Sequence, residues 1–394
     1  MKILYFSPNP LLSTSGNTGY GTHIREMICA FKQQGNIVEE LIIGNNDYPF
    51  ERINQTNKNF LKKFVHKYIW RSAKDYALIK RDKDSERLIE KTIRQFNPDV
   101  VYERASFLCS SGLNICKRFN IKYVVEVNAP FSQEMKWFEG ANSFFGSVSD
   151  RILRSQLNYS NKVITVSSAL KNYLKEYCND DSKITVTPNS VNESTIQIDS
   201  LCQDQLKKKY EITQNTIVIG FVGSIFPYHG VDLLIKAFSE VKKIFYNHDI
   251  KLLIVGDGYM LEELKQLTKT NKTEDDVIFT GSVKHENIFT YIDLMDVTVM
   301  AKSNWYGSPV KIFEYGALGK AIIAPDVSPV RDVMEDGVDG LLVQPSVEKI
   351  SEALNKFLGD PDLRKKLGNN FKSKVLSNYT WYQTAETILT TFNI

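Results

Sequence analysis

Residues 308–325 read SPVKIFEYGALGKAIIAP. They contain a helix pattern with capping residues at both ends, and a short apolar strand pattern follows it. Ser308 is a good N-cap, Pro309 suits the first helical position, and Gly319 suits a left-handed C-cap. The apolar run at 321–324 that follows is typical of a strand buried on both faces. This stretch therefore predicts a helix that leads into a buried parallel strand.

Lys311 is the unusual residue of this helix, because a cation in the first turn opposes the partial positive charge of a helix N-terminus. A bound anion would reverse the sign of that effect, so we expect a phosphate beside Lys311. Glu314 lies one turn further on, where its carboxylate could accept hydrogen bonds from a pair of sugar hydroxyls. A surface ion pair between Lys311 and Glu314 is the alternative explanation.

The composition is that of an ordinary globular protein, with 42% hydrophobic and 24% charged residues among 394. This length predicts about two domains. The net charge of +3 does not suggest a nucleic-acid partner. Five cysteines without C-x-x-C spacing indicate reduced thiols rather than disulfides or a zinc site. With no signal peptide and no apolar run near ~18 residues, we expect a cytoplasmic protein.

Short β-branched runs alternate with helical patterns in both halves of the chain, which predicts two doubly wound α/β domains with parallel sheets. The runs lie at residues 3–6, 37–43, 100–102, 123–127, 163–166 and 184–186, then at 217–222, 252–255, 277–279, 297–300, 321–324 and 341–343. Sheets of this kind bind ligands at the carboxyl ends of their strands, so we expect a cleft between the domains.

The domain limits follow from the polar stretch between Pro188 and about Asn215, which favours a linker region. We expect a first domain at residues 1–190 and a second at 191–377. A C-terminal helix at 378–394 is expected to pack back on the first domain.

Two loops at predicted strand ends carry residues suited to phosphate. Gly19 and Gly21 belong to a glycine-rich loop before a helix from about Thr22 to Gln34, where backbone N–H groups could approach an anion. A plain tight turn is the alternative. In the loop 223–230, His229 could donate to a phosphate, or it could be a capping or packing residue.

Residues 51–83 carry ten Lys or Arg against three acids. Apolar residues recur among them at helical spacing, so this segment predicts a basic amphipathic helix over about 58–80. Such a helix could rest on an anionic membrane surface. A surface helix packed on its own domain is the alternative.

Together these motifs make the chain resemble the retaining glycosyltransferases of the "group 1" family, which have the GT-B architecture of two Rossmann-like domains facing a central cleft. The resemblance covers nearly the whole length, with matching segments at 19–21, 99–104, 126–130, 166–168, 188–192, 223–232, 255–258, 308–325 and 336–343. It implies transfer of a sugar from a nucleoside-diphosphate sugar, such as a UDP-sugar, to an acceptor hydroxyl with the anomeric configuration kept and without a metal or other cofactor. The donor would lie mainly on the second domain.

The resemblance also implies an acceptor and a setting. The acceptor would be a saccharide or lipid-linked saccharide on the first domain, in bacterial surface polysaccharide, lipopolysaccharide or glycolipid assembly. The protein would then be cytoplasmic or peripheral on the inner face of the cytoplasmic membrane. Asp82-Lys83-Asp84 and Asp360-Pro361-Asp362 read D-x-D, the metal motif of the other glycosyltransferase architecture, but their helical contexts favour solvated or capping carboxylates.

Residue roles carry over as implications of the same resemblance. Glu314 matches the glutamate that holds the ribose hydroxyls. The backbone of Ser308, Pro309 and Val310 matches the loop that meets the diphosphate or donor sugar. Gly19 and Gly21 match the first-domain loop beside the same phosphate.

Three departures from the family pattern shape the expected chemistry. Tyr306 stands where the first glutamate of E-x7-E would be, Ser224 replaces the usual arginine, and His229 replaces the usual lysine. A branch of the family carries the same variants, which suggests that Lys311 and His229 take over the phosphate work.

Asn128, preceded by Glu126, stands close to where many relatives have a histidine lining the donor sugar. The expected catalytic residues are therefore Lys311, His229, Asn128 and Glu126. Because Tyr306 removes the obvious nucleophile, a same-face mechanism is favoured. A nucleotide-sugar epimerase of similar fold and a non-catalytic partner subunit are the alternatives.

Overall fold

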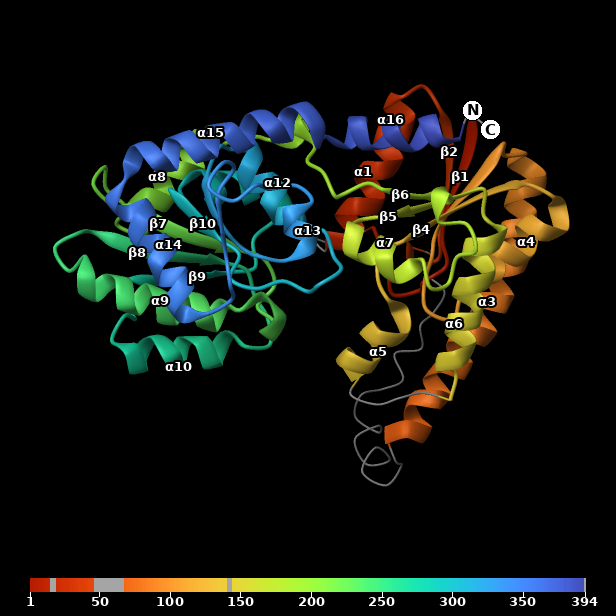
Figure 1. The fold of residues 1–394 in the computed structure, drawn as a ribbon, viewed down its shortest axis with the longest axis horizontal. Coiled ribbons are helices and arrows are strands. Elements are labelled where there is room, and N and C mark those ends of the chain that lie inside the picture. Colours follow the sequence, from red (N-terminus) through yellow and green to blue (C-terminus); the bar gives the residue numbers. More distant parts are fainter. Residues whose placement is uncertain (15–18, 46–66, 140–143, 393–394) are drawn as a thin grey trace. The chain divides into compact units, whose positions relative to one another are not determined.

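A computed structural model describes residues 1–14, 19–45, 67–139 and 144–392 of the chain (Figure 1). The chain divides into two compact units, which we describe separately. Unit 1 comprises Met1–Thr187 and Thr384–Ile394, and unit 2 comprises Pro188–Gln383.

Unit 1 contains a parallel sheet with the strand order β2-β1-β3-β4-β5-β6. Its strands are β1 (Lys2–Ser7), β2 (Ile37–Ile42), β3 (Val100–Arg104), β4 (Lys122–Val127), β5 (Lys162–Thr165) and β6 (Ile184–Val186). Its helices are α1 (Gly19–Gln33), α3 (Lys67–Phe96), α4 (Ser111–Phe119), α5 (Phe131–Glu139), α6 (Gly146–Tyr159) and α7 (Ser168–Leu174).

Unit 2 contains a second parallel sheet with the order β12-β11-β10-β7-β8-β9. Its strands are β7 (Ile217–Val222), β8 (Ile250–Val255), β9 (Val277–Gly281), β10 (Val297–Val299), β11 (Ala321–Pro325) and β12 (Leu341–Val343). Its helices are α8 (Ser200–Lys209), α9 (Val231–Ile244), α10 (Leu261–Asn271), α11 (Ile288–Asp293), α12 (Val310–Ala317), α13 (Ser328–Arg331), α14 (Val347–Gly359) and α15 (Pro361–Asn378). The last helix, α16 (Trp381–Thr391), begins in unit 2 and ends in unit 1.

The apolar runs of the sequence form strands because helices cover both faces of each sheet (Figure 1). In β7, Ile219 and Phe221 belong to one buried cluster, whereas Val218 and Val222 belong to another. Alternate residues of one strand thus enter different cores, which explains why the run is continuously apolar. The prediction of two doubly wound parallel sheets is confirmed.

Helix α12 differs from its predicted start. It begins at Val310, and Pro309 occupies the N-cap position without any side-chain capping bond, so Ser308 is not the N-cap. The predicted end is correct. Gly319 has φ +68°, and the N–H groups of Gly319 and Lys320 donate to the carbonyls of Gly316 and Tyr315, which is a Schellman motif.

Two other segments differ from the sequence predictions. Helix α1 already begins at Gly19, so Gly19 and Gly21 lie in its first turn rather than in a loop. The stretch expected to be a linker contains α8, whose N-cap Asp199 accepts a hydrogen bond from the Cys202 N–H. A capped helix in this polar segment was missed because few apolar positions mark it.

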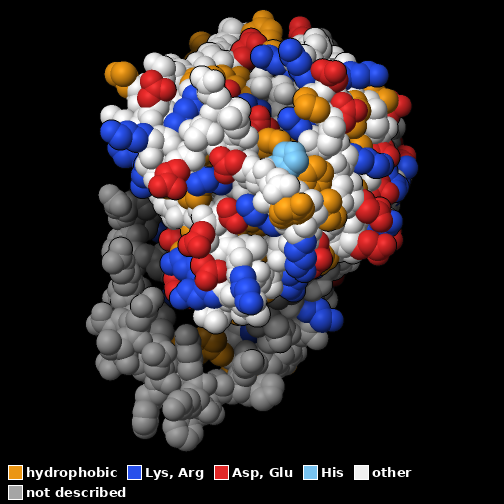
Figure 2. All heavy atoms as spheres, turned by 90° about the vertical axis from the view of Figure 1, so that its left-hand side faces the viewer, with side chains coloured by type: hydrophobic (Ala, Val, Ile, Leu, Met, Phe, Trp, Pro, Cys, Tyr) orange, Lys and Arg blue, Asp and Glu red, His pale blue; other side chains and the backbone are white. Residues whose placement is uncertain are grey.

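The view in Figure 2 shows lysine and arginine side chains interspersed with aspartate and glutamate over the face it presents. That face lacks the single-sign surface that nucleic-acid binding requires among its described residues. Among the described helices, none is long and apolar enough to cross a membrane.

Candidate functional site

Lys311, Phe221 and His229 meet at the carboxyl end of β7 in unit 2. Lys311 Nζ lies 4.2 Å from the centroid of the Phe221 ring, a cation–π contact. The His229 ring lies 5.8 Å from Phe221, centroid to centroid. Helix α12 supplies Lys311, and the loop after β7 supplies His229, so two predicted site residues are brought together.

Gly223 allows this close approach. Its φ is +142°, and a Cβ atom added there would lie 2.7 Å from Lys311 Nζ. Any larger residue would therefore strain the backbone and displace the ammonium group. The position after β7 must be glycine for Lys311 to lie where it does.

Lys311 Nζ is buried and has no hydrogen-bond partner among the residues that the structure describes. Burial lowers the pKa of Lys311 from 10.5 to about 7, and the negative charge of Glu314 offsets part of this effect. Glu314 lies one turn away on α12 and is partly buried. The surface ion pair considered as an alternative is not formed, and a buried cation without a partner fits a site for an anion.

His229 is held in a defined orientation. Its Nδ1 lies 2.5 Å from the carbonyl oxygen of Ser224, so Nδ1 carries the proton and donates to that oxygen. Burial and the positive charge of Lys311 lower the pKa of His229 to about 3. A neutral imidazole at pH 7 is thus expected in the protein without ligand.

Ser308 anchors the loop before α12 to the start of unit 2. Its hydroxyl accepts a hydrogen bond from the Asn189 N–H at 2.9 Å, and its carbonyl accepts one from Asn189 Nδ2 at 2.5 Å. This contact, rather than helix capping, uses the Ser308 side chain. Its partner lies 119 residues away in sequence, so local reasoning could not find it.

Tyr306 is buried, with 5% exposure, and its ring packs edge-on against Trp305. Asn304 Oδ1 accepts hydrogen bonds from the N–H groups of Tyr306 and Gly307, at 3.2 and 2.6 Å. The turn before α12 is therefore held by an asparagine that the sequence analysis missed. An Asn three residues before Gly-Ser-Pro was the available signal.

In unit 1, Glu126 on β4 is the centre of a buried polar cluster. Its Oε1 lies 2.7 Å from Arg104 on β3 and 2.6 Å from His23 Nε2 on α1. The Tyr102 hydroxyl donates to Oε2 at 2.8 Å, and the Asn128 amide nitrogen donates to Oε1. Glu126 and Asn128 were predicted as site residues, whereas His23 and Arg104 were not.

The charge of Glu126 is fixed by these neighbours. Burial alone would raise the pKa of Glu126, but the charges of His23 and Arg104, with hydrogen bonds from His23 and Asn128, hold it well below its usual range. Glu126 is thus an ionised carboxylate that can only accept hydrogen bonds. In the β3–β4 register Arg104 is directly beside Glu126, so the sheet itself forms this pair.

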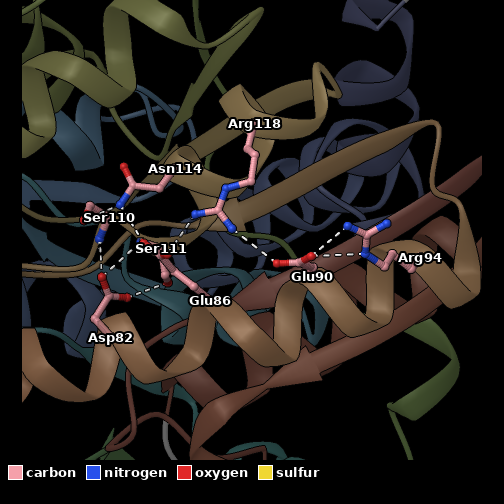
Figure 3. A network of polar contacts seen from close by, with 8 residues as sticks. All are labelled: Asp82, Glu86, Glu90, Arg94, Ser110, Ser111, Asn114 and Arg118. Carbon is pink, nitrogen blue, oxygen red and sulfur yellow. Dashed lines mark hydrogen bonds and ion pairs between the residues drawn. The ribbon is translucent and has the colours of Figure 1, made fainter.

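The D-x-D carboxylates bind helix ends, as expected. Asp82 on α3 accepts hydrogen bonds from the N–H groups of Ser110 and Ser111 at 2.6 and 3.0 Å, at the start of α4 (Figure 3). Asp360 is the N-cap of α15 and accepts from the Leu363 N–H at 2.8 Å. In the described part of the chain, no three His, Cys, Asp or Glu side chains are grouped to hold a metal ion.

Two family profiles match successive parts of the chain. The glycosyl transferases group 1 profile matches residues 202–374, and the Glycosyltransferase Family 4 profile matches residues 17–195. With its two Rossmann-like units, the chain is a glycosyltransferase of the GT-B architecture. It belongs to the group 1 glycosyltransferases.

Relatives and solved structures agree with this assignment. An uncharacterized glycosyltransferase of Methanocaldococcus jannaschii is 27% identical over 290 residues, 72% of each chain. The lipopolysaccharide 1,2-N-acetylglucosaminetransferase of Salmonella typhimurium is 26% identical over 57% of this chain and 60% of that protein. Sucrose-phosphate synthase from Thermosynechococcus elongatus has the same fold, with a TM-score of 0.75, 16% identity and coverage of 99% and 98%. Anabaena HepE in complex with UDP has a TM-score of 0.72 at 16% identity, covering 100% and 99%.

Proposed function

We propose that this protein is a retaining glycosyltransferase that moves a sugar from a nucleoside-diphosphate sugar to an acceptor hydroxyl. The observation that carries the proposal is the buried ammonium group of Lys311, which has no hydrogen-bond partner in the described part of the chain and lies beside Phe221 and Gly223 at the carboxyl end of a parallel sheet. Ligands bind doubly wound sheets at this end. A bound diphosphate would supply the negatively charged partner that the ammonium group of Lys311 needs.

The chemistry requires stabilisation of a leaving group. The bond between the anomeric carbon and the phosphate oxygen breaks, and a bond between that carbon and the acceptor oxygen forms. The departing diphosphate gains negative charge, which Lys311 and the first turn of α12 are suited to stabilise. His229 can donate from Nε2 only when it is protonated, because Ser224 already occupies its Nδ1 proton.

Retention of configuration is proposed through a same-face mechanism. Position 306 holds a buried tyrosine rather than a carboxylate, so the carboxylate nucleophile of a double displacement is missing at that position. The acceptor proton would pass to an oxygen of the leaving phosphate. Catalysis then needs no metal or other cofactor, and the D-x-D oxygens of Asp82 and Asp360 are already used by helix N–H groups.

The names of similar proteins support a nucleotide and a setting. Anabaena HepE has been solved with UDP and with UDP-glucose, which supports a UDP-sugar donor. Relatives include the Salmonella lipopolysaccharide enzyme and a GDP-mannose-dependent phosphatidylinositol monomannoside mannosyltransferase of Mycobacterium tuberculosis. A bacterial surface polysaccharide or glycolipid pathway, with a saccharide or lipid-linked acceptor, is therefore proposed.

The test is slow hydrolysis of the donor in the absence of an acceptor. The purified protein is incubated with UDP- and GDP-sugars, and released nucleotide is measured. Lys311→Met should lower release by about 100- to 1000-fold, because it removes a cation that meets growing charge. Lys356→Met, which changes an exposed lysine on α14, is the matched control. Release of no nucleotide by the wild type would reject the proposal, and an isomerised sugar would indicate an epimerase.

A membrane surface is proposed as a further partner, through the N-terminal half of α3. Ile69 and Tyr76 are 57% and 62% exposed, and Ala73 between them is exposed too. The polar residues Arg71 and Asp75 are buried instead and form an ion pair of 2.9 Å. Helix α3 therefore packs on its own domain, as in the alternative considered from sequence, but it does so through its other side and leaves this apolar stripe exposed.

Basic residues flank this apolar stripe. Lys74, Lys80 and Arg81 are exposed, which suits a surface of anionic lipids. The remaining part of the predicted helix, residues 58–66, lies outside the described residues. We propose that the stripe contacts the inner face of the cytoplasmic membrane, where a lipid-linked acceptor would be found.

A further inference from the structure

The strand order of the unit 2 sheet reverses at β7. From β7 the sheet continues to β8 and β9 on one side and to β10, β11 and β12 on the other. The register of β7 with β8 continues to Val222, whereas its register with β10 ends at Gly220. Among the described strands, the last two residues of β7 thus have no partner on the β10 side. This is the topological switch point, where doubly wound sheets bind ligands.

Val222 has its backbone N–H group on this unpaired side. The N–H of Gly223 donates to Val255 of β8 at 2.9 Å, and the N–H groups of successive strand residues point to opposite sides. The Val222 N–H therefore points toward β10. Instead of a strand, the hydroxyl of Tyr315 on α12 accepts this N–H at 2.8 Å, and the same hydroxyl lies 3.5 Å from the Val222 carbonyl oxygen. A tyrosine side chain thus takes the place of the missing strand partner.

Burial keeps the Tyr315 hydroxyl in one chemical form. Tyr315 is 0% exposed, and this burial raises the pKa of Tyr315 above its ordinary value. Its own ionisation therefore plays no part in the neutral range of pH. Without the hydroxyl, the buried N–H of Val222 would lose its acceptor, which is unfavourable.

The contact lies beside the ammonium group of Lys311. Lys311 precedes Tyr315 by four residues, so both side chains leave α12 on the same side. Lys311 Nζ contacts Phe221, the residue before Val222, and lies close to Gly223, the residue after it. Tyr315 therefore binds the middle residue of the segment 221–223, whose other two residues lie against Lys311. One helix both holds the end of β7 and carries the cation that lies there.

We propose that Tyr315 is a positioning residue for Lys311. Its hydroxyl ties α12 to the end of β7 and so holds the ammonium group against Phe221, where the diphosphate would bind. This role rests on the proposed function and adds a residue to it that touches neither donor nor acceptor, because its side chain is fully buried. The alternative is that Tyr315 only fills the buried cluster to which it belongs.

The experiment removes the hydroxyl alone, with Tyr315→Phe. Turnover in hydrolysis of a saturating UDP- or GDP-sugar should fall about 5- to 50-fold, because a displaced ammonium group stabilises the departing diphosphate less well. The KM for the donor should change less than about 3-fold, because Lys311 meets charge that grows as the bond breaks. Lys311→Met combined with Tyr315→Phe should be no slower than Lys311→Met alone, since both changes remove the same effect.

A second measurement needs no substrate. In the protein without ligand, burial lowers the pKa of Lys311 from 10.5 to about 7. Tyr315→Phe should raise the pKa of Lys311 toward its ordinary value, because an ammonium group that is no longer held against Phe221 can reach water. NMR titration of the protein with 13C-labelled lysine measures this, and the Lys311 signal is the one missing from Lys311→Met. The charged or titratable neighbours of Lys311, Glu314 and His229, are the same in both proteins.

Tyr123→Phe is the matched control. Tyr123 on β4 is an equally buried tyrosine, and its hydroxyl donates to Glu103 at 2.7 Å in unit 1. The same atom is removed and a buried partner again loses a hydrogen bond, so the free energy of unfolding should fall in both variants. Turnover and the pKa of Lys311 should keep their wild-type values in Tyr123→Phe.

A folded Tyr315→Phe protein in which the pKa of Lys311 does not move would overturn the positioning role, and so would wild-type turnover in that variant. If the wild type releases no nucleotide, the proposed function fails, and the NMR titration still decides whether Tyr315 holds Lys311 in place. Should Tyr315→Phe not fold, 4-fluorophenylalanine at position 315 replaces it in both measurements, because fluorine fills the space of the hydroxyl but accepts hydrogen bonds only weakly.

Discussion

Lys311 lies in a buried environment that disfavours its positive charge. Its Nζ is buried against Phe221, and its pKa is lowered to about 7. A site prepared for an anion is less stable without one, so stability and function conflict at this residue. Two predictions follow from this environment, one for the protein without ligand and one for ligand binding.

The first prediction is that Lys311→Met stabilises the ligand-free protein. The folded-state pKa of Lys311 is lower than its ordinary value, so the unfolded chain binds more protons between about pH 7 and 10.5. Burying the charged form is therefore unfavourable below that window, and the penalty fades as pH rises through it. Thermal unfolding should show a higher Tm for Lys311→Met at pH 7 and a vanishing difference near pH 10.5. A lower Tm at pH 7 would contradict this account.

The second prediction is proton uptake when a nucleoside diphosphate binds. The pKa values of His229 and Lys311, about 3 and about 7, should both rise beside a diphosphate. Calorimetry with UDP in buffers of different ionisation enthalpy should show uptake at pH 7.5. At pH 5.5 Lys311 is already protonated, whereas the terminal phosphate of UDP also titrates near this pH, so the contribution of His229 is the part of the proton exchange that is lost in His229→Asn. His248→Asn, an exposed histidine, is the control.

Candidate site residues were easier to predict from the sequence than the contacts that those residues make. Lys311, His229, Glu126 and Asn128 stood out because each lies at or next to an end of a recognisable element. Phe221 and the Asn189 anchor of Ser308 could not be found, because contacts between distant residues depend on how strands and helices pack. Their roles follow from the tertiary structure alone.

At the scale of elements, the apolar runs predicted the strands because most strands are buried on both faces, as β1, β3 and β8 are, and are flanked by turn residues. Helix ends were less predictable. The end of α12 was correct, since Gly319 is determined locally by its positive φ. Its start was wrong, since Asn189 competes successfully for the Ser308 hydroxyl.

Helix α4 gives the third prediction. Its N-cap Ser110 makes no side-chain capping bond, and Asp82 of α3 accepts the first N–H groups instead (Figure 3). Asp82→Ala should lower the free energy of unfolding by about 1 to 3 kcal/mol, because two amides lose their acceptor. Denaturant unfolding measures this, with Asp84→Ala as the exposed control on the same helix. Equal stability of the two variants would show that the cap contributes nothing.

At the scale of the molecule, the two units repeat one plan. In each, a parallel sheet places charged and polar residues at the carboxyl ends of its strands, Lys311 with His229 in unit 2 and Glu126 with Asn128 in unit 1. This plan was predictable because it follows from alternating strands and helices. Which side of α3 packs on unit 1 was left open by the sequence, because a helical period predicts two faces but not which one is buried.

The fourth prediction concerns α3. If the exposed stripe of Ile69, Ala73 and Tyr76 contacts lipid, the wild type should sediment with vesicles containing anionic phospholipid and should be released by high salt. Replacing Lys74, Lys80 and Arg81 with glutamate should reduce sedimentation strongly, because attraction becomes repulsion. Ile69→Ser with Tyr76→Ser should weaken it as well, because less apolar surface is buried.

The control for the triple glutamate variant makes the same change of charge on another helix. Lys365, Lys366 and Lys372 are exposed on α15, and their replacement with glutamate should leave sedimentation close to wild type. Donor hydrolysis should survive in all of these variants, because none of the changed residues belongs to the candidate site. Equal losses in both triple variants would mean that net charge alone governs the interaction, and a wild type that never sediments would remove the membrane from the proposed function.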